Sequence, residues 1–203
     1  MRGLYLVTPD WDDTDKLLAV TEQALQAGVA LLQYRHKNAG AALRKEQAAA
    51  LLALCRQHGC QLVINDFIEL CQQLGADGVH VGGTDASVAQ MRALLGPNKI
   101  VGASCYGDLP RAQQAQLDGA SYVAFGGFYP SRVKQYPVTT DPAIVAQAKA
   151  CLALPCVVIG GMNAANAAPL VAHGADMVAA ISSVYLAPDP QAAVRGLRSL
   201  YGK

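Results

Sequence analysis

The segment LGADGVHVGG, residues 74–83, places a glycine and an alanine at the end of an apolar helical stretch and follows them with a short apolar run. Three other segments repeat this order: QAGVALLQYR (26–35), DGASYVAFGG (118–127) and HGADMVAAIS (173–182). Each segment indicates a helix that ends at a glycine and leads into a β-strand. Successive glycines are 47, 44 and 55 residues apart, about twice the length of one strand–helix unit, at Gly28, Gly75, Gly119 and Gly174. We therefore expect a further strand between each pair.

Three short runs rich in β-branched residues lie between these glycines, and a fourth precedes the first glycine. They are LYLVT (4–8), QLVIN (61–65), KIVGAS (99–104) and CVVIGG (156–161). Between the strands, segments rich in alanine, leucine and glutamine carry apolar residues at helical spacing. Eight strands alternating with helices predict an α/β protein with a parallel sheet, a single (β/α)8 TIM barrel domain over residues 1–203. An open doubly wound sheet is the alternative, but the sequence lacks its G-x-G-x-x-G turn.

Composition limits the class of partner. Hydrophobic residues make up 52% of the 203 residues and charged residues 15%, which favours a compact chain over a disordered one. The net charge of +1 gives no general attraction to nucleic acid or to a membrane, so we expect small-molecule substrates as partners. No apolar run reaches the roughly 18 residues of a membrane span, and no secretory signal is present. We expect a cytoplasmic protein whose six cysteines are buried free thiols.

In a barrel of this class the functional groups lie at the C-terminal ends of the strands. The segment QYRHK ends the second strand. Because successive strand residues point to opposite faces, Gln33, Arg35 and Lys37 share one face. An amide, a guanidinium and an ammonium at the barrel mouth would bind a polyanion, most simply a pyrophosphate. The alternative is a solvated basic loop.

Acidic residues follow the next two strands. Asn65 and Asp66 end the third strand, and Asp85 follows the fourth. Magnesium typically takes one or two protein carboxylates and completes its shell with phosphate oxygens and water. Asp66 and Asp85 are therefore candidate magnesium ligands beside the cationic residues. The alternative is that Asp66 caps the helix that follows. We interpret His80 as a packed strand residue rather than a base.

A second anion site is expected after the seventh and eighth strands. Glycines expose backbone N–H groups there, and a helix N-terminus favours negative charge. The candidates are Gly160, Gly161, Ile181 and Ser182, and the alternative is a tight turn that binds nothing. The connection at 126–142 is long enough to be a lid, with Ser131 and Lys134 as its functional side chains. Ser104 on the fifth strand would face the space between the two anion sites.

Taken in order, these motifs resemble those of the thiamine phosphate synthase family over nearly the whole chain, from LYLVT to AAISSVY. They are Q-x-R-x-K at 33–37, N-D at 65–66, A-D-G-V-H-x-G-x-x-D at 76–85, G-x-S at 102–104, a loop lysine at 134 and I-G-G at 159–161. The resemblance implies a (β/α)8 barrel that joins an aminopyrimidine diphosphate to a thiazole monophosphate. It also implies Mg²⁺ as cofactor and the release of pyrophosphate and thiamine phosphate.

The same resemblance implies a role for each candidate residue. The pyrimidine substrate and its diphosphate would contact Gln33, Tyr34, Arg35, His36, Lys37 and Asn65. Magnesium would be held by Asp66 and Asp85. Ser104 and Lys134 would contact the reacting pair and join Arg35 and Lys37 as candidate catalytic residues. The thiazole phosphate would contact Ser131, Arg132, Val133, Gly161, Ile181 and Ser182.

The chain departs from the family pattern at several positions. Gly83 replaces a usual glutamine, Tyr106 a histidine and Gly127 a proline, while Val133 offers only its backbone where a threonine hydroxyl is usual. Two alternatives to a synthase stay open: a thiazole tautomerase-like isomerase, and a non-catalytic barrel that binds a phosphate ligand. The diphosphate and metal residues favour the synthase, because the isomerase does not need them.

Overall fold

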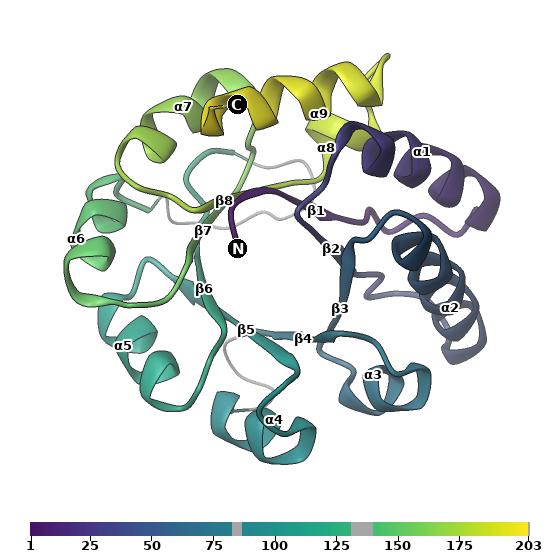
Figure 1. The fold of residues 1–203 in the computed structure, drawn as a ribbon, viewed down its shortest axis with the longest axis horizontal. Helices are drawn as coiled ribbons and strands as arrows, with labels where there is room; N and C mark the ends of the chain where they lie inside the picture. The colour runs from purple at the N-terminus through teal and green to yellow at the C-terminus, as the bar shows by residue number, and fades with distance from the viewer. Residues whose placement is uncertain (83–86, 131–139, 203) are drawn as a thin grey trace.

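The computed structural model describes residues 1–82, 87–130 and 140–202. Eight parallel strands pair in chain order and close into a barrel (Figure 1). They are β1 (Gly3–Val7), β2 (Leu31–Tyr34), β3 (Gln61–Asn65), β4 (Gly78–Val81), β5 (Ile100–Tyr106), β6 (Tyr122–Phe125), β7 (Cys156–Ile159) and β8 (Met177–Ala180). The predicted (β/α)8 barrel is confirmed. The open-sheet alternative is wrong, because β1 pairs with β8 and leaves no edge strand.

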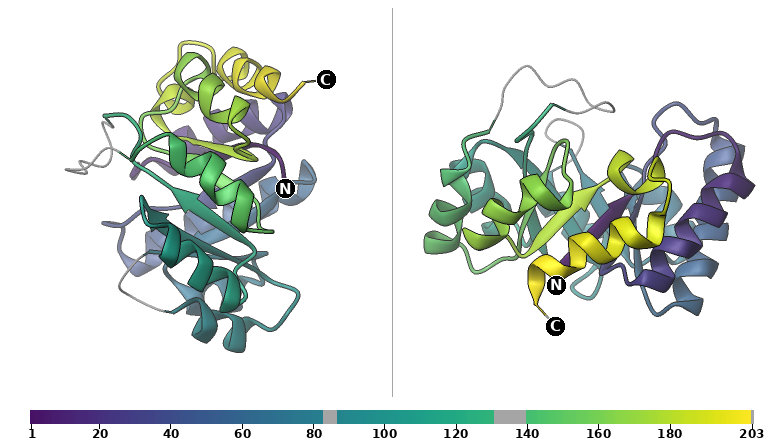
Figure 2. Two further views of the ribbon diagram at one scale, coloured as in Figure 1. Left: turned by 90° about the vertical axis from the view of Figure 1, so that its left-hand side faces the viewer. Right: turned by 90° about the horizontal axis from the view of Figure 1, so that it is seen from above.

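The helices form the outer layer of the ring (Figure 1). They are α1 (Thr14–Ala27), α2 (Ala41–Gln57), α3 (Ile68–Leu74), α4 (Val88–Leu95), α5 (Leu109–Leu117), α6 (Ala143–Cys151), α7 (Ala164–Ala172), α8 (Ser182–Tyr185) and α9 (Pro190–Arg198), followed by the 3-10 turn η1 (Ser199–Tyr201). Figure 2 shows the two ends of the chain at the same end of the barrel. There the Arg2 guanidinium carbon lies 5.7 Å from the centroid of the Tyr201 ring.

The strand register divides the core into two layers. Tyr5 pairs with Leu31 on one side and with Ala179 on the other, and all three pack inside the barrel. The alternate residues, such as Leu6 and Leu32, pack outward against the helices in a larger apolar cluster. The barrel interior is filled mainly by Tyr5, Val7, Leu31, Val63, Ile100, Tyr122, Ala124, Val157, Met177 and Ala179. Side chains on the inner face therefore build both the core and the floor of any site at the barrel mouth.

The glycine-containing repeats have a structural cause. Gly75 ends α3 in the left-handed conformation, with φ of 67°, which only glycine adopts without strain. Two residues later, the Asp77 carboxylate accepts a hydrogen bond from the Leu62 N–H at 2.8 Å, and the Asp77 N–H donates to the Leu62 carbonyl at 2.9 Å. Asp176 makes the equivalent pair of bonds at the start of β7, at 2.8 and 2.9 Å. Each of these carboxylates thus fixes the residue just before one strand against the first residues of the neighbouring strand.

All six cysteines are free, and five of them are buried while Cys151 is exposed. The prediction of buried thiols is confirmed for five positions and wrong for Cys151, which lies at the end of α6. Among the helices of the described residues, none combines the length and apolarity that a membrane span needs.

Candidate active site

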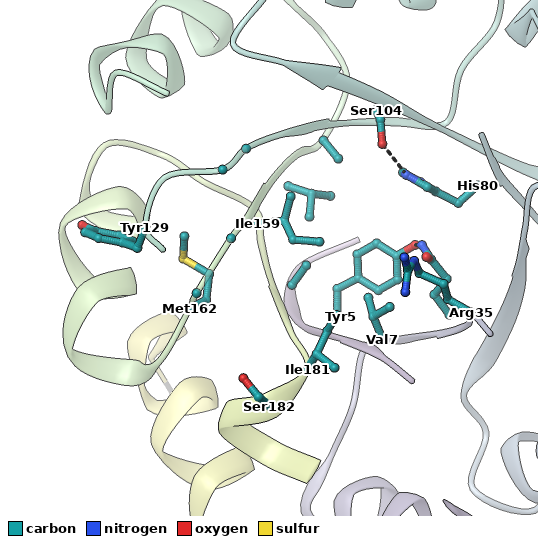
Figure 3. Close-up of a pocket in the computed structure, with 18 of the residues that line it drawn as sticks. Tyr5, Val7, Arg35, His80, Ser104, Tyr129, Ile159, Met162, Ile181 and Ser182 are labelled. Atoms are coloured by element: carbon teal, nitrogen blue, oxygen red, sulfur yellow. Dashed lines mark hydrogen bonds between the residues drawn. The ribbon is translucent and has the colours of Figure 1, made fainter. Parts of the chain in front are cut away.

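A pocket of about 280 Å³ opens at the C-terminal ends of the strands (Figure 3). Its apolar lining includes Val7, Ala124, Val157, Ile159 and Ala179. Arg35, His80 and Ser104 lie on one side of it, whereas Ser182, Met162 and Tyr129 lie on the other. The inward-facing strand ends thus form an elongated cavity with a different polar group at each end.

Arg35 is the charged group of the first end. Thr8 holds its backbone, because the Thr8 hydroxyl accepts from the Arg35 N–H at 2.8 Å and donates to the Arg35 carbonyl at 3.0 Å. Asp10 holds its side chain, with Nη1 at 3.2 and 3.3 Å from the two carboxylate oxygens. Only 6% of Arg35 is exposed, and its buried Nε has no hydrogen-bond partner among the described residues. The β1–α1 loop therefore orients a guanidinium that still has a donor to satisfy.

The other residues of the Q-x-R-x-K motif do not share one arrangement. Gln33 lines the pocket, but the buried Tyr34 points to the outer layer, where its hydroxyl donates to Gln47 Oε1 at 3.0 Å. His36 is buried beside Asp12, with Nε2 at 3.0 Å from a carboxylate oxygen. Lys37 lies in an exposed turn and does not line the pocket. The inward alternation continues one residue past β2 to Arg35, but the chain then turns, so the alternation does not carry Lys37 to the inner face.

Asn65 and Asp66 lie at the end of β3, the strand that pairs with β2. Asn65 Nδ2 donates to Asp66 Oδ2 at 2.6 Å, and the Gly82 N–H donates to Asp66 Oδ1 at 3.3 Å. The backbone of Asp66 has φ of 62°, and α3 begins only at Ile68 without a side-chain cap. The helix-capping alternative for Asp66 is therefore wrong. Its carboxylate is held toward the β4 end instead.

The carboxylate oxygens of Asp66 at this rim are ligands of the kind that a magnesium ion takes. Each Asp66 oxygen accepts one hydrogen bond among the described residues and keeps further lone pairs. Within the described residues, no group of three or more acidic, histidine or cysteine side chains lies close enough together to hold a metal ion. Magnesium does not require such a cluster, because phosphate oxygens and water supply most of its ligands. The second predicted ligand, Asp85, lies outside the described residues.

The second end of the pocket is formed where β7 and β8 leave the barrel. Gly160, Gly161, Ile181 and Ser182 all line it, and Ser182 is the first residue of the short helix α8. Gly160 and Gly161 have φ of 116° and 60°. A Cβ on Gly160 would lie 2.6 Å from the Gly127 Cα, so close backbone packing also requires glycine at this position. Ser131, Arg132, Val133 and Lys134, predicted for the lid, lie outside the described residues.

A chain of hydrogen-bonded polar side chains crosses the barrel, and all its members except Tyr122 line the pocket. Gln33 Nε2 donates to the Tyr5 hydroxyl, whose oxygen lies 2.6 Å from the Tyr122 hydroxyl. The Tyr122 oxygen lies 2.9 Å from His80 Nδ1. His80 Nε2 lies 2.9 Å from Ser104 Oγ, the bond drawn as a dashed line in Figure 3. Burial raises the pKa of both Tyr5 and Tyr122 well above the ordinary tyrosine value. Both phenols are therefore protonated at neutral pH.

The sequence did not predict a site role for three members of this hydrogen-bonded network, Tyr5, Tyr122 and His80. His80 is indeed buried in a strand, but it faces the pocket rather than only packing. The alternation of GVHV could have shown this, because it puts His80 on the same inward face as Gly78. Asp10 was missed because it lies in a loop whose approach to Arg35 depends on the pairing of β1 with β2.

The fold and the pocket together define a class: (β/α)8 barrels with a small-molecule pocket at the C-terminal ends of their strands. Comparison with known proteins narrows the class to a family. A family model described as thiamine monophosphate synthase matches residues 4–184. This chain belongs to that family.

Individual relatives agree with the family match. The chain is 66% identical over 203 residues to the thiamine-phosphate synthase of Janthinobacterium sp. (strain Marseille), covering 100% of this chain and 98% of the relative. It is 49% identical over 199 residues to that of Thiobacillus denitrificans, covering 98% and 94%. A solved structure of thiamine phosphate pyrophosphorylase from Pyrococcus furiosus superposes with a TM-score of 0.86 at 28% identity, covering 98% of this chain and 94% of that one.

Proposed function

We propose that this protein condenses 4-amino-2-methyl-5-(diphosphomethyl)pyrimidine with a thiazole monophosphate to give thiamine phosphate and pyrophosphate. Family membership supports the activity. The observation that carries it to this pocket is Arg35, a buried guanidinium at the pocket wall whose Nε lacks a partner among the described residues. A diphosphate oxygen is the acceptor that such a donor fits best.

The two ends of the pocket suit two substrates of unequal charge. The diphosphate would lie at the Arg35 end, near Asn65 and the exposed Lys37. The thiazole phosphate would lie against Gly161 and the first turn of α8, where backbone N–H groups favour an anion. The apolar walls between the ends would hold the two rings face to face. This arrangement brings the thiazole nitrogen and the pyrimidine methylene carbon together and removes much of the entropic cost of their reaction.

Carbon–oxygen cleavage is the difficult step of this reaction. Arg35 would neutralise the negative charge that grows on the departing pyrophosphate, and Asp10 would keep the guanidinium in place. The electron-rich aminopyrimidine spreads the positive charge left on its methylene carbon. Ser104 would orient the pyrimidine ring from β5, while Lys134, in the segment that the sequence predicts to be a lid, would add a second cation. No side-chain nucleophile is needed for this chemistry.

We also propose Mg²⁺ as cofactor, held by Asp66 and Asp85. When bound, it would add charge neutralisation for the leaving diphosphate. In this role, the left-handed backbone of Asp66 and its two hydrogen bonds would direct its carboxylate across the rim rather than toward α3. We further propose that the protein acts in the cytoplasm without nucleic-acid or membrane partners, in keeping with its net charge of +1.

The test is pyrophosphate release with both substrates and magnesium. We expect Arg35→Ala and Asp66→Ala each to lower turnover at least about tenfold, which corresponds to about 1.4 kcal/mol. Arg56→Ala is the matched control, because Arg56 lies exposed on α2 and away from the pocket; it should keep full turnover. Omission of magnesium should slow the parent protein more than the Asp66 variant.

Two outcomes would contradict this proposal. Unchanged turnover in both the Arg35 and Asp66 variants would remove the mechanism. Absence of pyrophosphate release from the parent protein would instead favour the isomerase or the non-catalytic barrel, and binding of the thiazole phosphate alone would distinguish these from an inactive preparation.

A further inference from the structure

We propose that Tyr5, Tyr122 and His80 are positioning residues that fix Ser104 as a hydrogen-bond donor to the substrate ring, and so select an aminopyrimidine over its oxo analogue. This inference rests on the proposed function and assigns a task to three residues that the mechanism above does not use. The three lie between Gln33 and Ser104, which both line the pocket.

The direction of the hydrogen bonds follows from counting protons. Gln33 Nε2 donates to the Tyr5 oxygen, so the single proton of the Tyr5 phenol is left for Tyr122. Tyr122 in turn donates its only proton to His80 Nδ1. His80 must then carry its proton on Nε2, from where it donates to Ser104 Oγ. The Ser104 hydroxyl proton is thereby left to point into the pocket.

The opposite direction has a physical cost. If His80 carried a proton on Nδ1, it would donate to Tyr122 and Tyr122 would donate to Tyr5. The Tyr5 oxygen would then receive protons from both Gln33 and Tyr122, and its own proton would have no acceptor. Tyr5 is 1% exposed and Tyr122 is fully buried, so water does not satisfy that proton.

The fold also leaves room for the Tyr122 ring of this hydrogen-bonded network. Gly102 on β5 has no side chain where the Tyr122 ring lies, and a Cβ there would be 2.0 Å from the Tyr122 Cζ. The ring therefore occupies one place, and its hydroxyl meets Tyr5 and His80 together. Such a fixed, fully bonded network defines the donor and acceptor roles of its ends.

The direction of the hydrogen bonds in this side-chain network determines which ligand the pocket accepts. A 4-aminopyrimidine offers ring nitrogens with free lone pairs and an exocyclic amino donor. The Ser104 proton suits such a ring nitrogen, and the Gln33 Oε1 atom, which has no partner among the described residues, suits the amino group. The 4-oxo analogue in its lactam form has a proton on one ring nitrogen and would meet the Ser104 donor with a donor of its own.

The first test measures the tautomer of His80 directly. Nitrogen-15 NMR of histidine-labelled protein, with the His80 signals identified by their loss in His80→Asn, should show the Nε2–H form in the parent protein. This measurement needs no activity, so it distinguishes failure of this inference from failure of the proposed function. An Nδ1–H or doubly protonated His80 would overturn the inference.

The second test removes one hydroxyl. Tyr122→Phe should lower kcat/KM for the pyrimidine diphosphate about tenfold, leave KM for the thiazole phosphate unchanged, and move the NMR signal of His80 Nδ1, because that nitrogen loses its hydrogen-bond donor. It should also reduce the preference for the amino over the 4-oxo pyrimidine. Tyr185→Phe is the matched control, because that buried phenol bonds to Thr21 at 2.8 Å and does not line the pocket.

The control variant should change none of these quantities. An equal loss of kcat/KM in both variants, or an unchanged His80 signal in Tyr122→Phe, would overturn the positioning role. If Tyr122→Phe does not fold, the tautomer of His80 measured in the parent protein still decides the inference, because that measurement needs no change at Tyr122.

Discussion

At the scale of single residues, Gly102 shows how closely the barrel interior is packed. Gly102→Ala would put a Cβ 2.2 Å from the Tyr122 hydroxyl oxygen, so we expect a loss of about 1–3 kcal/mol in the free energy of unfolding. Urea unfolding measures this loss. Gly196→Ala in α9 is the control, because its Cβ would lie 3.7 Å from Ala164, an ordinary contact. It should stabilise the protein by about 0.5–1 kcal/mol. Equal midpoints for both variants would contradict this account.

At the scale of elements, the junction of β7 and α7 links helix capping to the second anion site. Asn166 Nδ2 donates to the Gly161 carbonyl at 2.9 Å, while Asn163 caps α7 through the N–H groups of Ala165 and Asn166, both at 3.0 Å. We expect Asn166→Ala to raise KM for the thiazole phosphate roughly fivefold, since a lost hydrogen bond costs about 1 kcal/mol. KM for the pyrimidine should stay unchanged.

Asn163→Ala provides the comparison at the same junction. It removes the cap and should cost about 1 kcal/mol of stability, but the bond from Asn166 to the Gly161 carbonyl stays. Steady-state kinetics and urea unfolding on both variants separate the two effects. A higher KM for the thiazole phosphate in Asn163→Ala alone would contradict the role given to Asn166.

At the scale of the whole molecule, the reactivity of the cysteine thiols measures whether the barrel is fully folded. Burial raises the pKa of Cys71 and Cys156 to about 11 and that of Cys105 to about 12. These thiols are therefore protonated as well as covered at pH 8. We expect a disulfide reagent such as dithionitrobenzoate to label one thiol rapidly in the folded protein, Cys151, and all six in denaturant. Cys151→Ser should abolish the rapid phase, and two or more rapid thiols in the parent would contradict the burial.

The architecture was predictable from the sequence because barrel strands carry their own marks. Glycine-terminated helices and β-branched runs located all eight strands, and the β3 range of Gln61–Asn65 agrees with the prediction. The pairing of β1 with β8 follows once eight such units are counted. The boundaries were less predictable: KIVGAS was expected to end at Ser104, but β5 continues to Tyr106 through an irregularity in its pairing with β6.

The site was predictable only where a strand itself sets the direction of a side chain. Alternation placed Gln33 on the pocket wall and still held for Arg35, the first residue after β2, but it failed for Lys37, which lies in the exposed turn that follows. Tyr5 and Tyr122 escaped notice because aromatic residues in strands are typical of a core, and only the closed ring brings their hydroxyl groups within 2.6 Å. Sequence reveals which strand a polar residue belongs to, but contacts across the barrel depend on the full register.

The pairing of β1 with β8 has a consequence for how this protein meets other chains. A ring has no outermost member, so each barrel strand has its main-chain groups engaged by neighbours on both flanks. An extended peptide therefore finds no row of open amide and carbonyl groups along which to lie. Within the described residues, the eight barrel strands are therefore closed to β-augmentation, and contacts that this part of the barrel makes with other macromolecules run through its helices and loops.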